Sequence, residues 1–295
     1  MIDLHNHILP GIDDGAADAS VAIAMAKMAV EEGTTDMACT PHILPGLYHN
    51  SGDMIQRAVA ELQQILLREG VPLNLVSGAD VHLVPDLVAG LRDGRLLTLA
   101  SSRYVLIEPP HHVYPARLVD ALFDLIVAGY VPILTHPERL AWINTHYAEI
   151  LRLFQGGVWM QITAASLLGK FGKRAQYWSE RMLDEGRVHI LASDAHDTTR
   201  RPVNLRAGRD AAARRVGQEE AEHMVSTRPQ GILAGELPSA LPMPLAICRG
   251  EGSNETGKSN GRVESISTTV RASRRGAIGS TRLDHTIGRL RQFFG

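Results

Sequence analysis

Short apolar runs rich in β-branched residues alternate along this chain with longer segments of helical periodicity. This alternation is typical of repeated βα units, in which parallel strands form a sheet that helices cover. Strands are expected at residues 1–4, 35–39, 73–79, 104–107, 131–135, 158–162 and 189–193. Helices are expected at residues 18–32, 53–68, 115–128, 141–154 and 173–185, and the weaker pattern before the fourth strand allows a short helix at 84–91 and a connector at 96–99. The pattern predicts an α/β fold with a parallel sheet of seven strands.

The composition narrows the classes of function. The 295 residues are 44% hydrophobic and carry a net charge of −2, so a large core is possible but bulk charge attracts neither nucleic acid nor an anionic membrane. Two cysteines, Cys39 and Cys248, are too few for a disulfide framework and fit a reducing compartment. No segment resembles a signal peptide or a membrane-spanning helix. These features predict a cytoplasmic protein with no membrane span and no nucleic-acid partner.

The last part of the chain differs in composition from the rest. Residues 245–295 contain nine Arg or Lys and four Asp or Glu, with many Gly, Ser and Thr and few large apolar side chains. Such a segment cannot bury enough apolar surface to fold alone. We therefore expect a folded domain at residues 1–235 and a basic, disordered tail at residues 236–295. A short amphipathic helix at 287–294 could dock on an acidic partner or a membrane surface, although a solvated tail is the simpler interpretation.

Histidine and acidic residues follow six of the seven expected strands. They are His5 and His7 after the first strand, His42 after the second, Asp80 after the third, Glu108 after the fourth, His136 after the fifth, and Asp194 and His196 after the seventh. In parallel βα barrels the carboxyl ends of the strands lie together and carry the active site. These side chains are therefore expected to converge on one face of the molecule.

The spacing within two pairs supports this prediction. Alternate side chains of an extended segment share a face, so His5 and His7, and likewise Asp194 and His196, can point toward one ion. Each pair alone is weak evidence, because isolated residues of this kind usually face solvent, form salt bridges or hydrogen bond to a loop. A buried cluster of so many ionisable groups is costly unless it is paired or binds cations. Imidazoles and carboxylates without thiolate suit Mn, Fe or Zn, and two or three ions are expected.

The remaining histidines show no comparable pattern. We interpret them as surface or satisfied core residues: His49, His82, His111, His112, His146, His189, His223 and His285. His111 and His112 are distinguished only by their place in the loop after Glu108, where they could line the mouth of the site.

Several other catalytic and nucleotide-binding motifs are absent from this sequence. After Cys39 the chain reads Thr-Pro-His-Ile-Leu-Pro, without the arginine that a cysteine-dependent tyrosine phosphatase needs to hold phosphate. There is no Gly-x-x-x-x-Gly-Lys-Ser/Thr loop, no Gly-x-Gly-x-x-Gly after a strand and no Gly-x-Ser-x-Gly elbow. The sequence therefore favours metal-dependent chemistry over a covalent nucleophile or a nucleotide-binding fold.

Several motifs occur together and in order along the first 235 residues. They are Met-Ile-Asp-Leu-His-Asn-His at 1–7, Thr-Pro-His at 40–42, Gly-Ala-Asp at 78–80, Tyr-Val-Leu-Ile-Glu at 104–108, Thr-His-Pro-Glu-Arg at 135–139 and Ala-Ser-Asp-Ala-His at 192–196. In combination they resemble the polymerase-and-histidinol-phosphatase (PHP) superfamily. Within it, Ile-Asp-Asp-Gly at 12–15 and His-Pro-Glu-Arg at 136–139 resemble the bacterial manganese-dependent protein-tyrosine phosphatases of capsule and exopolysaccharide loci.

The resemblance implies a distorted seven-stranded (β/α) barrel of the PHP type with a trinuclear centre, usually of manganese. One ion would take His5, His7, Asp194 and a bridging Asp80; a second would share Asp80 with Glu108 and His136; a third would bind Asp14, His42 and His196. Relatives often have Glu where this chain has Asp80, and the shorter side chain affects the geometry of the bridge more than the activity. Asp13 is an alternative to Asp14, because the sequence does not show which carboxylate turns inward.

The resemblance also implies a function, the hydrolysis of phosphotyrosine in a protein, with a bacterial tyrosine kinase that regulates polysaccharide export as the partner. A metal-activated hydroxide would attack phosphorus. Arg139, and Arg201 or Arg200, would stabilise the phosphoryl oxygens, and His42 or His196 could protonate the departing phenolate. Two alternatives stay open: a small-molecule phosphoesterase such as histidinol phosphatase, and a catalytically silent metal-binding regulator of the kinase.

Overall fold

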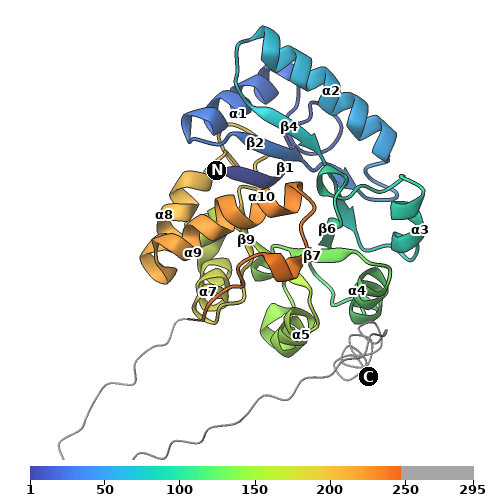
Figure 1. Ribbon diagram of the computed structural model, residues 1–295, viewed down its shortest axis with the longest axis vertical. Helices are drawn as coiled ribbons and strands as arrows, with labels where there is room; N and C mark the ends of the chain where they lie inside the picture. Colours follow the sequence, from blue (N-terminus) through green and yellow to red (C-terminus); the bar gives the residue numbers. More distant parts are fainter. Residues whose placement is uncertain (247–295) are drawn as a thin grey trace, which may run out of the picture. The chain divides into compact units, whose positions relative to one another are not determined.

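The computed structural model describes residues 1–246, so most of the expected tail lies outside the described residues. The described chain forms an α/β fold in which helices lie around parallel strands (Figure 1). Its strands are β1 (Ile2–Asn6), β2 (Asp36–Cys39), β3 (His42–Ile43), β4 (Asn74–Ser77), β5 (Asp80–His82), β6 (Tyr104–Glu108), β7 (Val131–Thr135), β8 (Trp159–Thr163) and β9 (Ile190–Ala192).

The strands form two sheets. One has the order β1-β2-β4 and the other the order β3-β5-β6-β7-β8-β9, and every pair in both sheets is parallel. The prediction of an α/β fold with parallel strands is therefore confirmed. Residues 1–246 contain nine strands rather than the expected seven, and no single hydrogen-bonded sheet in this part of the chain closes into a barrel.

The two additional strands, β3 and β5, each follow an expected strand after a break of two residues. Thr40 and Pro41 separate β2 from β3, and proline has no N–H to donate to a strand ladder. Gly78 and Ala79 separate β4 from β5. A side-chain carbon on Gly78 would lie 2.9 Å from Leu99 Cδ2 and 3.1 Å from Thr40 Cγ2, so only glycine fits this break without a shift of its neighbours. After each break the chain continues into a short strand of the second sheet.

The first and last strands are joined just beyond their ends. Asn6 and Ala195 form a parallel bridge between the two sheets. The Asp194 N–H donates to the His5 carbonyl, and the His7 N–H donates to the Ala195 carbonyl, both over 2.8 Å. These bonds bring the polar residues of β1 beside those that follow β9.

Helices connect most of the strands. They are α1 (Ala19–Glu31), α2 (Gly52–Arg68), α3 (Leu87–Arg92), α4 (Leu118–Val127), α5 (Ile143–Gln155), α6 (Ala164–Leu167), α7 (Gly172–Asp184), α8 (Leu205–Val216), α9 (Gln218–Glu222) and α10 (Arg228–Leu233), with shorter helical turns at Leu99–Ser101, Pro137–Arg139, His223–Thr227 and Pro238–Ala240. The six expected helices correspond to α1 to α5 and α7. The sequence does not predict α8, which buries only Leu205, Gly208 and Ala212 and so has a narrow apolar stripe.

An apolar stripe holds each long helix against the strands. In α2, Ile55, Val59, Leu62 and Leu66 recur every three or four residues, which places them on one face. All four are buried in the main hydrophobic core. Each buried side chain of this size contributes about 1.5–3 kcal/mol of hydrophobic free energy. Because packing of this kind fixes the helices on the outside of the strands, the strand ends stay available for polar side chains.

The described chain continues in contact with the fold beyond residue 235. Leu241 is buried, and the Pro242 carbonyl accepts a hydrogen bond of 2.6 Å from Arg228 Nε. The division of the chain at residue 235 stays a prediction, since residues 247–295 lie outside the described part. No helix within residues 1–246 combines the length and the apolar character that crossing a bilayer requires.

Candidate metal centre

His5 of β1, His7 just after it and Asp80 at the start of β5 meet Asp194, which follows β9. His5 Nε2 lies 3.3 Å from His7 Nε2, 3.5 Å from Asp80 Oδ2 and 3.6 Å from Asp194 Oδ1. His7 Nε2 lies 3.5 Å from the same Asp194 oxygen. All four residues are buried. The structure therefore brings together the first ligand set expected from the sequence.

These separations are close to those of atoms that share an ion. Ligand atoms about 2.1 Å from a cation stand roughly 3.0–3.4 Å apart at coordination angles near 90–109°. Both oxygens of Asp80 are buried without a hydrogen-bond partner. An unpaired buried carboxylate is costly, so the geometry and the unsatisfied oxygens both fit a divalent cation.

A second set of ligands comes from the loop after β1, from β3 and from the segment after β9. His42 Nε2 lies 3.4 Å and His196 Nε2 lies 3.5 Å from Asp14 Oδ1. The His196 Nε2 atom is buried and makes no hydrogen bond. These three side chains and His7 are close enough for their ligand atoms to surround one cation.

The structure separates the roles of Asp13 and Asp14. Asp13 accepts hydrogen bonds from His7 Nδ1 over 2.7 Å, from the Gly15 N–H over 2.9 Å and from the His42 N–H over 3.0 Å. Both Asp13 oxygens are thus used to orient its neighbours, while Asp14 faces the second ligand set. A side-chain carbon on Gly15 would lie 2.0 Å from the His7 carbonyl oxygen, so this approach of the loop to His7 needs glycine.

Glu108, at the end of β6, lies among four histidines. His136 Nε2 is 3.6 Å from Glu108 Oε1, and His42 Nδ1 is 3.4 Å from Glu108 Oε2. His111 Nε2 donates a hydrogen bond of 2.8 Å to Oε1, and His82 Nε2 lies 2.5 Å from Oε2. Both His82 and His111 therefore contact a predicted ligand. For His111 this agrees with the expectation that it could line the mouth of the site, whereas the sequence predicts that His82 lies outside it.

A signal for His82 was present in the sequence. Asp80 and His82 repeat the two-residue spacing of Asp194 and His196, and alternate residues of a strand share a face. His111 has no such pattern, and only its place in the loop that follows β6 marks it. A search for every Asp-x-His pair near a strand end would have found His82 but not His111.

Hydrogen bonds from outside the centre orient His5 on β1 and His7 just after it. His5 Nδ1 donates to Gln161 Oε1 over 2.9 Å, and His7 Nδ1 donates to Asp13. A donor at Nδ1 leaves the lone pair on Nε2, the atom that faces the centre. Gln161 lies on β8, the strand for which the sequence predicts no ligand. β8 therefore contributes to the centre by orienting His5 through Gln161 rather than by supplying a ligand.

Two of the predicted ligand residues have a left-handed backbone. The φ angle is 33° at His136 and 50° at Asp194, values that residues other than glycine rarely adopt. Such strain is concentrated at functional sites, where the surrounding structure imposes it. Here the strained turns follow β7 and β9 directly and direct both side chains into the centre.

Electrostatics keep two of the histidines neutral. Burial lowers the pKa of His42 to about 4. Burial and the charge of Arg139 lower the pKa of His136 well below its usual value. Both rings are therefore neutral near pH 7, which is the state that binds a cation.

Opposite charges keep Asp194 ionised. Burial raises the pKa of Asp194, but the positive charges of Arg201 and Arg139 outweigh this effect and hold the pKa well below its usual range. A carboxylate that stays ionised in a buried site is suited to bind a cation.

Two predicted arginines reach the centre. Arg139 Nη1 and Arg201 Nη2 both donate to Asp194 Oδ2, the second over 2.6 Å. Both guanidiniums lie over the ring of Phe171, 4.4 Å and 5.8 Å from its centroid. The side chain of Arg200 is 90% exposed. Of the two arginines that the sequence left open, the structure therefore brings Arg201 to the site.

Most of the other histidines have contacts or exposure that agree with their interpretation. His146 stacks on Tyr114, and His189 stacks on Trp159 with ring centroids 4.2 Å and 4.5 Å apart. His223 hydrogen bonds to Thr227. His49 and His112 are exposed, and His285 lies outside the described residues.

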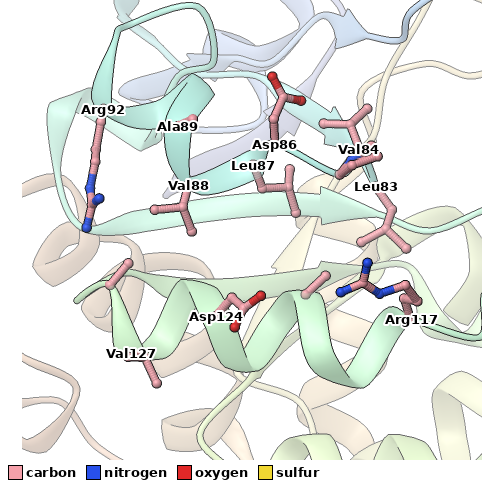
Figure 2. A pocket seen from close by; sticks show the side chains of 13 residues that line it. Leu83, Val84, Asp86, Leu87, Val88, Ala89, Arg92, Arg117, Asp124 and Val127 are labelled. Carbon is pink, nitrogen blue, oxygen red and sulfur yellow. The ribbon is translucent and has the colours of Figure 1, made fainter.

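A cavity of about 660 Å³ lies between α3 and α4, outside the cluster of ligands. Figure 2 shows Leu83, Val84 and Arg117 at one end of this cavity and Arg92 and Val127 at the other. Its lining residues include none of the predicted ligands and neither of the two arginines that contact Asp194. The cavity is therefore a separate feature of the helical layer.

The parallel strands and the histidines and carboxylates at their ends define a metal-binding α/β protein with several candidate cation sites. Residues 1–234 match the family model for capsular polysaccharide synthesis, CpsB/CapC. The chain belongs to this family.

Named relatives cover most of the chain. The tyrosine-protein phosphatase YwqE of Bacillus subtilis (strain 168) is 34% identical over 219 residues, which are 74% of this chain and 86% of YwqE. The putative tyrosine-protein phosphatase CapC of Staphylococcus aureus is 36% identical over 206 residues, 70% of this chain and 81% of CapC. Crystal structures of YwqE and of CpsB from Streptococcus pneumoniae are described as those of unique metal-dependent tyrosine phosphatases. One of these structures matches the present chain with a TM-score of 0.78 and 31% sequence identity. The match covers 84% of the present chain and 100% of the chain in that structure.

Proposed function

We propose that this protein is a metal-dependent protein-tyrosine phosphatase. The observation that carries the proposal is a buried group of imidazoles and carboxylates at the spacing of shared ions, beside two arginines that meet at Asp194. The names of YwqE and CapC, and the match to YwqE and CpsB in structure, support the same activity. The family description connects it with capsular polysaccharide synthesis.

The proposed cofactor is manganese, in three sites, with Fe or Zn as ions that suit the same ligand types. The sites are His5, His7, Asp194 and Asp80; Asp80, Glu108 and His136; and Asp14, His42 and His196. Bound divalent cations would supply Lewis acidity and lower the pKa of a water molecule from ~15.7 toward ~7. The spacing of the ligand atoms and the unsatisfied oxygens of Asp80 support this assignment.

Arg139 and Arg201 bind the phosphoryl group in this proposal. A guanidinium has five N–H donors, and each of the two uses one on Asp194. Other donors of each fork can bond to two phosphoryl oxygens at once. Because negative charge increases on these oxygens in the transition state, the bonds strengthen as the reaction proceeds. Phe171, which lies beneath both guanidiniums, limits their movement.

His42 is the proposed contact of the leaving phenolate. Its ring lies between two ligand sets, with Nε2 3.4 Å from Asp14 and Nδ1 3.6 Å from Asp80. The ring of Tyr48 stacks on it with the centroids 5.5 Å apart. A phenol has a pKa near ~10, so the leaving group needs only modest assistance.

We infer that the strands have the order of a distorted seven-stranded PHP barrel. β2 continues into β3 and β4 into β5, so each of these pairs occupies one position of a ring that runs on through β6, β7, β8 and β9. The bridge between Asn6 and Ala195 then connects the last position to β1. This order and the parallel pairing support a barrel that is interrupted at the two breaks.

The proposed substrate is a phosphotyrosine-bearing protein, a bacterial tyrosine kinase that regulates polysaccharide export, and the proposed location is the cytoplasm. The family description and the names of the relatives support the substrate. The buried free thiol of Cys39 is compatible with a reducing compartment.

The test is hydrolysis before and after removal of the metal. Tag-free protein is treated with EDTA, assayed on para-nitrophenyl phosphate and a phosphotyrosyl peptide, and assayed again after Mn²⁺ is added back. We expect chelation to abolish the activity and Mn²⁺ to restore it, with elemental analysis showing the metal lost and regained.

Three results would contradict the proposal. Full activity without metal would exclude the mechanism. Preferential hydrolysis of histidinol phosphate, measured in parallel, would assign a small-molecule substrate. Metal-loaded protein that binds a tyrosine kinase without hydrolysing any aryl phosphate would instead be a silent regulator.

A further inference from the structure

His82 lies on β5 two residues after Asp80, so both side chains project from the same face of the strand. Asp194 and His196 have the same spacing after β9, and both of those residues are among the proposed ligands. His82 is only 17% exposed. Its position in the strand therefore directs it toward the centre rather than into solvent.

The contact between His82 and Glu108 is close, but its geometry is not that of a well-aligned hydrogen bond. His82 Nε2 lies 2.5 Å from Glu108 Oε2, and the Glu108 side chain is 7% exposed. Nevertheless, Glu108 Oε2 is buried without a hydrogen-bond partner, so the imidazole is beside this oxygen without being aligned as its donor. A divalent cation beside this pair could bind both the imidazole nitrogen and the carboxylate oxygen.

The environment of this pair contains further unsatisfied atoms. His42 Nδ1 lies 3.4 Å from Glu108 Oε2 and is itself buried without a hydrogen bond. The ring centroids of His42 and His82 are 5.2 Å apart, and ligand atoms of all three residues are close enough to surround one ion. The polar atoms on this side of Glu108 therefore lack partners in the same way as those of Asp80.

We propose that His82 is a metal ligand, which binds a divalent cation together with Glu108 on the side of the centre that faces His42. To share an ion, His82 Nε2 and Glu108 Oε2 must move apart from 2.5 Å by roughly 0.5–0.9 Å, since ligand atoms stand about 3.0–3.4 Å apart. A partly exposed side chain on a short strand can make this movement. The inference rests on the proposed metal centre and not on the reaction.

The first test replaces the imidazole with a thiol. Tag-free His82→Cys, wild-type protein and His112→Cys are stripped of metal, loaded with Co²⁺ and compared by near-ultraviolet absorption. A thiolate bound to cobalt gives a charge-transfer band that a merely structural cysteine does not give. His112 is the matched control, since it is exposed and its ring lies 6.5 Å from that of His111. The native cysteines, Cys39 and Cys248, are present in all three proteins, so the wild-type spectrum is the baseline for any signal from them.

We expect the band in His82→Cys and not in the wild type or the control. A folded, cobalt-loaded His82→Cys protein whose spectrum matches the wild type would overturn the proposal. Circular dichroism establishes the fold, and elemental analysis of cobalt establishes loading.

The second test measures manganese directly. In His82→Ala we expect one bound ion to be weakened by more than the roughly 10–100-fold that loss of an outer hydrogen-bond partner costs, with no change in His112→Ala. Unchanged manganese content and affinity in His82→Ala would refute the role of this residue. Wild-type protein that binds no manganese would refute the whole centre instead, so the two failures are distinguishable.

Discussion

Arg139 provides a quantitative test of phosphate recognition. Arg139→Ala removes a guanidinium that, like that of Arg201, donates to Oδ2 of Asp194. The Arg139 side chain is only 16% exposed. If two of its remaining donors hold the phosphoryl group, two charge-assisted hydrogen bonds are lost, each worth about 1.5–3 kcal/mol. A total of about 3–6 kcal/mol corresponds to a fall in kcat/KM of roughly 10²–10⁴-fold, since each 1.36 kcal/mol is tenfold.

The assay is the hydrolysis of para-nitrophenyl phosphate at saturating Mn²⁺, with metal content measured on the same samples. Arg139→Lys should recover only part of the rate, because an ammonium is a point charge without the planar fork. Arg200→Ala is the matched control, since that side chain is 90% exposed, and it should stay within about twofold of wild type.

A loss smaller than about fivefold in Arg139→Ala, with the metal content intact, would show that this arginine does not hold the phosphoryl group. A loss of metal in parallel with activity would instead show that Arg139 acts through Asp194. The measurement therefore separates phosphate binding from support of a ligand.

Three further predictions concern other parts of the molecule. Alkylation of the folded protein with iodoacetamide should leave hydrolysis unchanged and Cys39 unmodified by mass spectrometry, since burial raises the pKa of that thiol; inactivation through this residue would favour a cysteine mechanism. Arg228→Met should lower the free energy of unfolding, measured in urea, by about 3–5 kcal/mol, because it leaves Glu220 buried and unpaired. A second change, Glu220→Leu, should recover most of this loss. A loss below about 1 kcal/mol in Arg228→Met would mean that the ion pair is not needed for stability. Val127→Asp, in the cavity between α3 and α4 and 59% exposed, should not change hydrolysis of a small aryl phosphate; a large loss would make that cavity part of the active site.

Most of the centre could be predicted because its residues follow strands that apolar runs mark clearly. His5, His7, Asp80 and Asp194 needed only the rule that parallel strands end on one side. The distances between their ligand atoms, 3.3–3.6 Å, agree with that expectation.

Other features depend on tertiary contacts that no local pattern records. The roles of Asp13 and Asp14 differ because the loop that carries them packs against His7, and only the fold shows which carboxylate is used by backbone N–H groups. The breaks between β2 and β3 and between β4 and β5 depend on the missing donor of Pro41 and on packing around Gly78. Glu108 was found from its strand, but the loop histidine that bonds to it, His111, carries no periodic signal.

The joining of β1 to the segment after β9 has a consequence for the lifetime of the protein. His5 on β1 and Asp194 after β9 are proposed ligands of the same cation. A bound cation therefore connects two parts of the chain that separate on unfolding. A ligand that binds only the native state adds about 2.7 kcal/mol of stability at a hundred times its dissociation constant. A shortage of the metal would therefore stop catalysis and also make the less stable protein more susceptible to proteases. The amount of enzyme in the cell would then follow the supply of the ion.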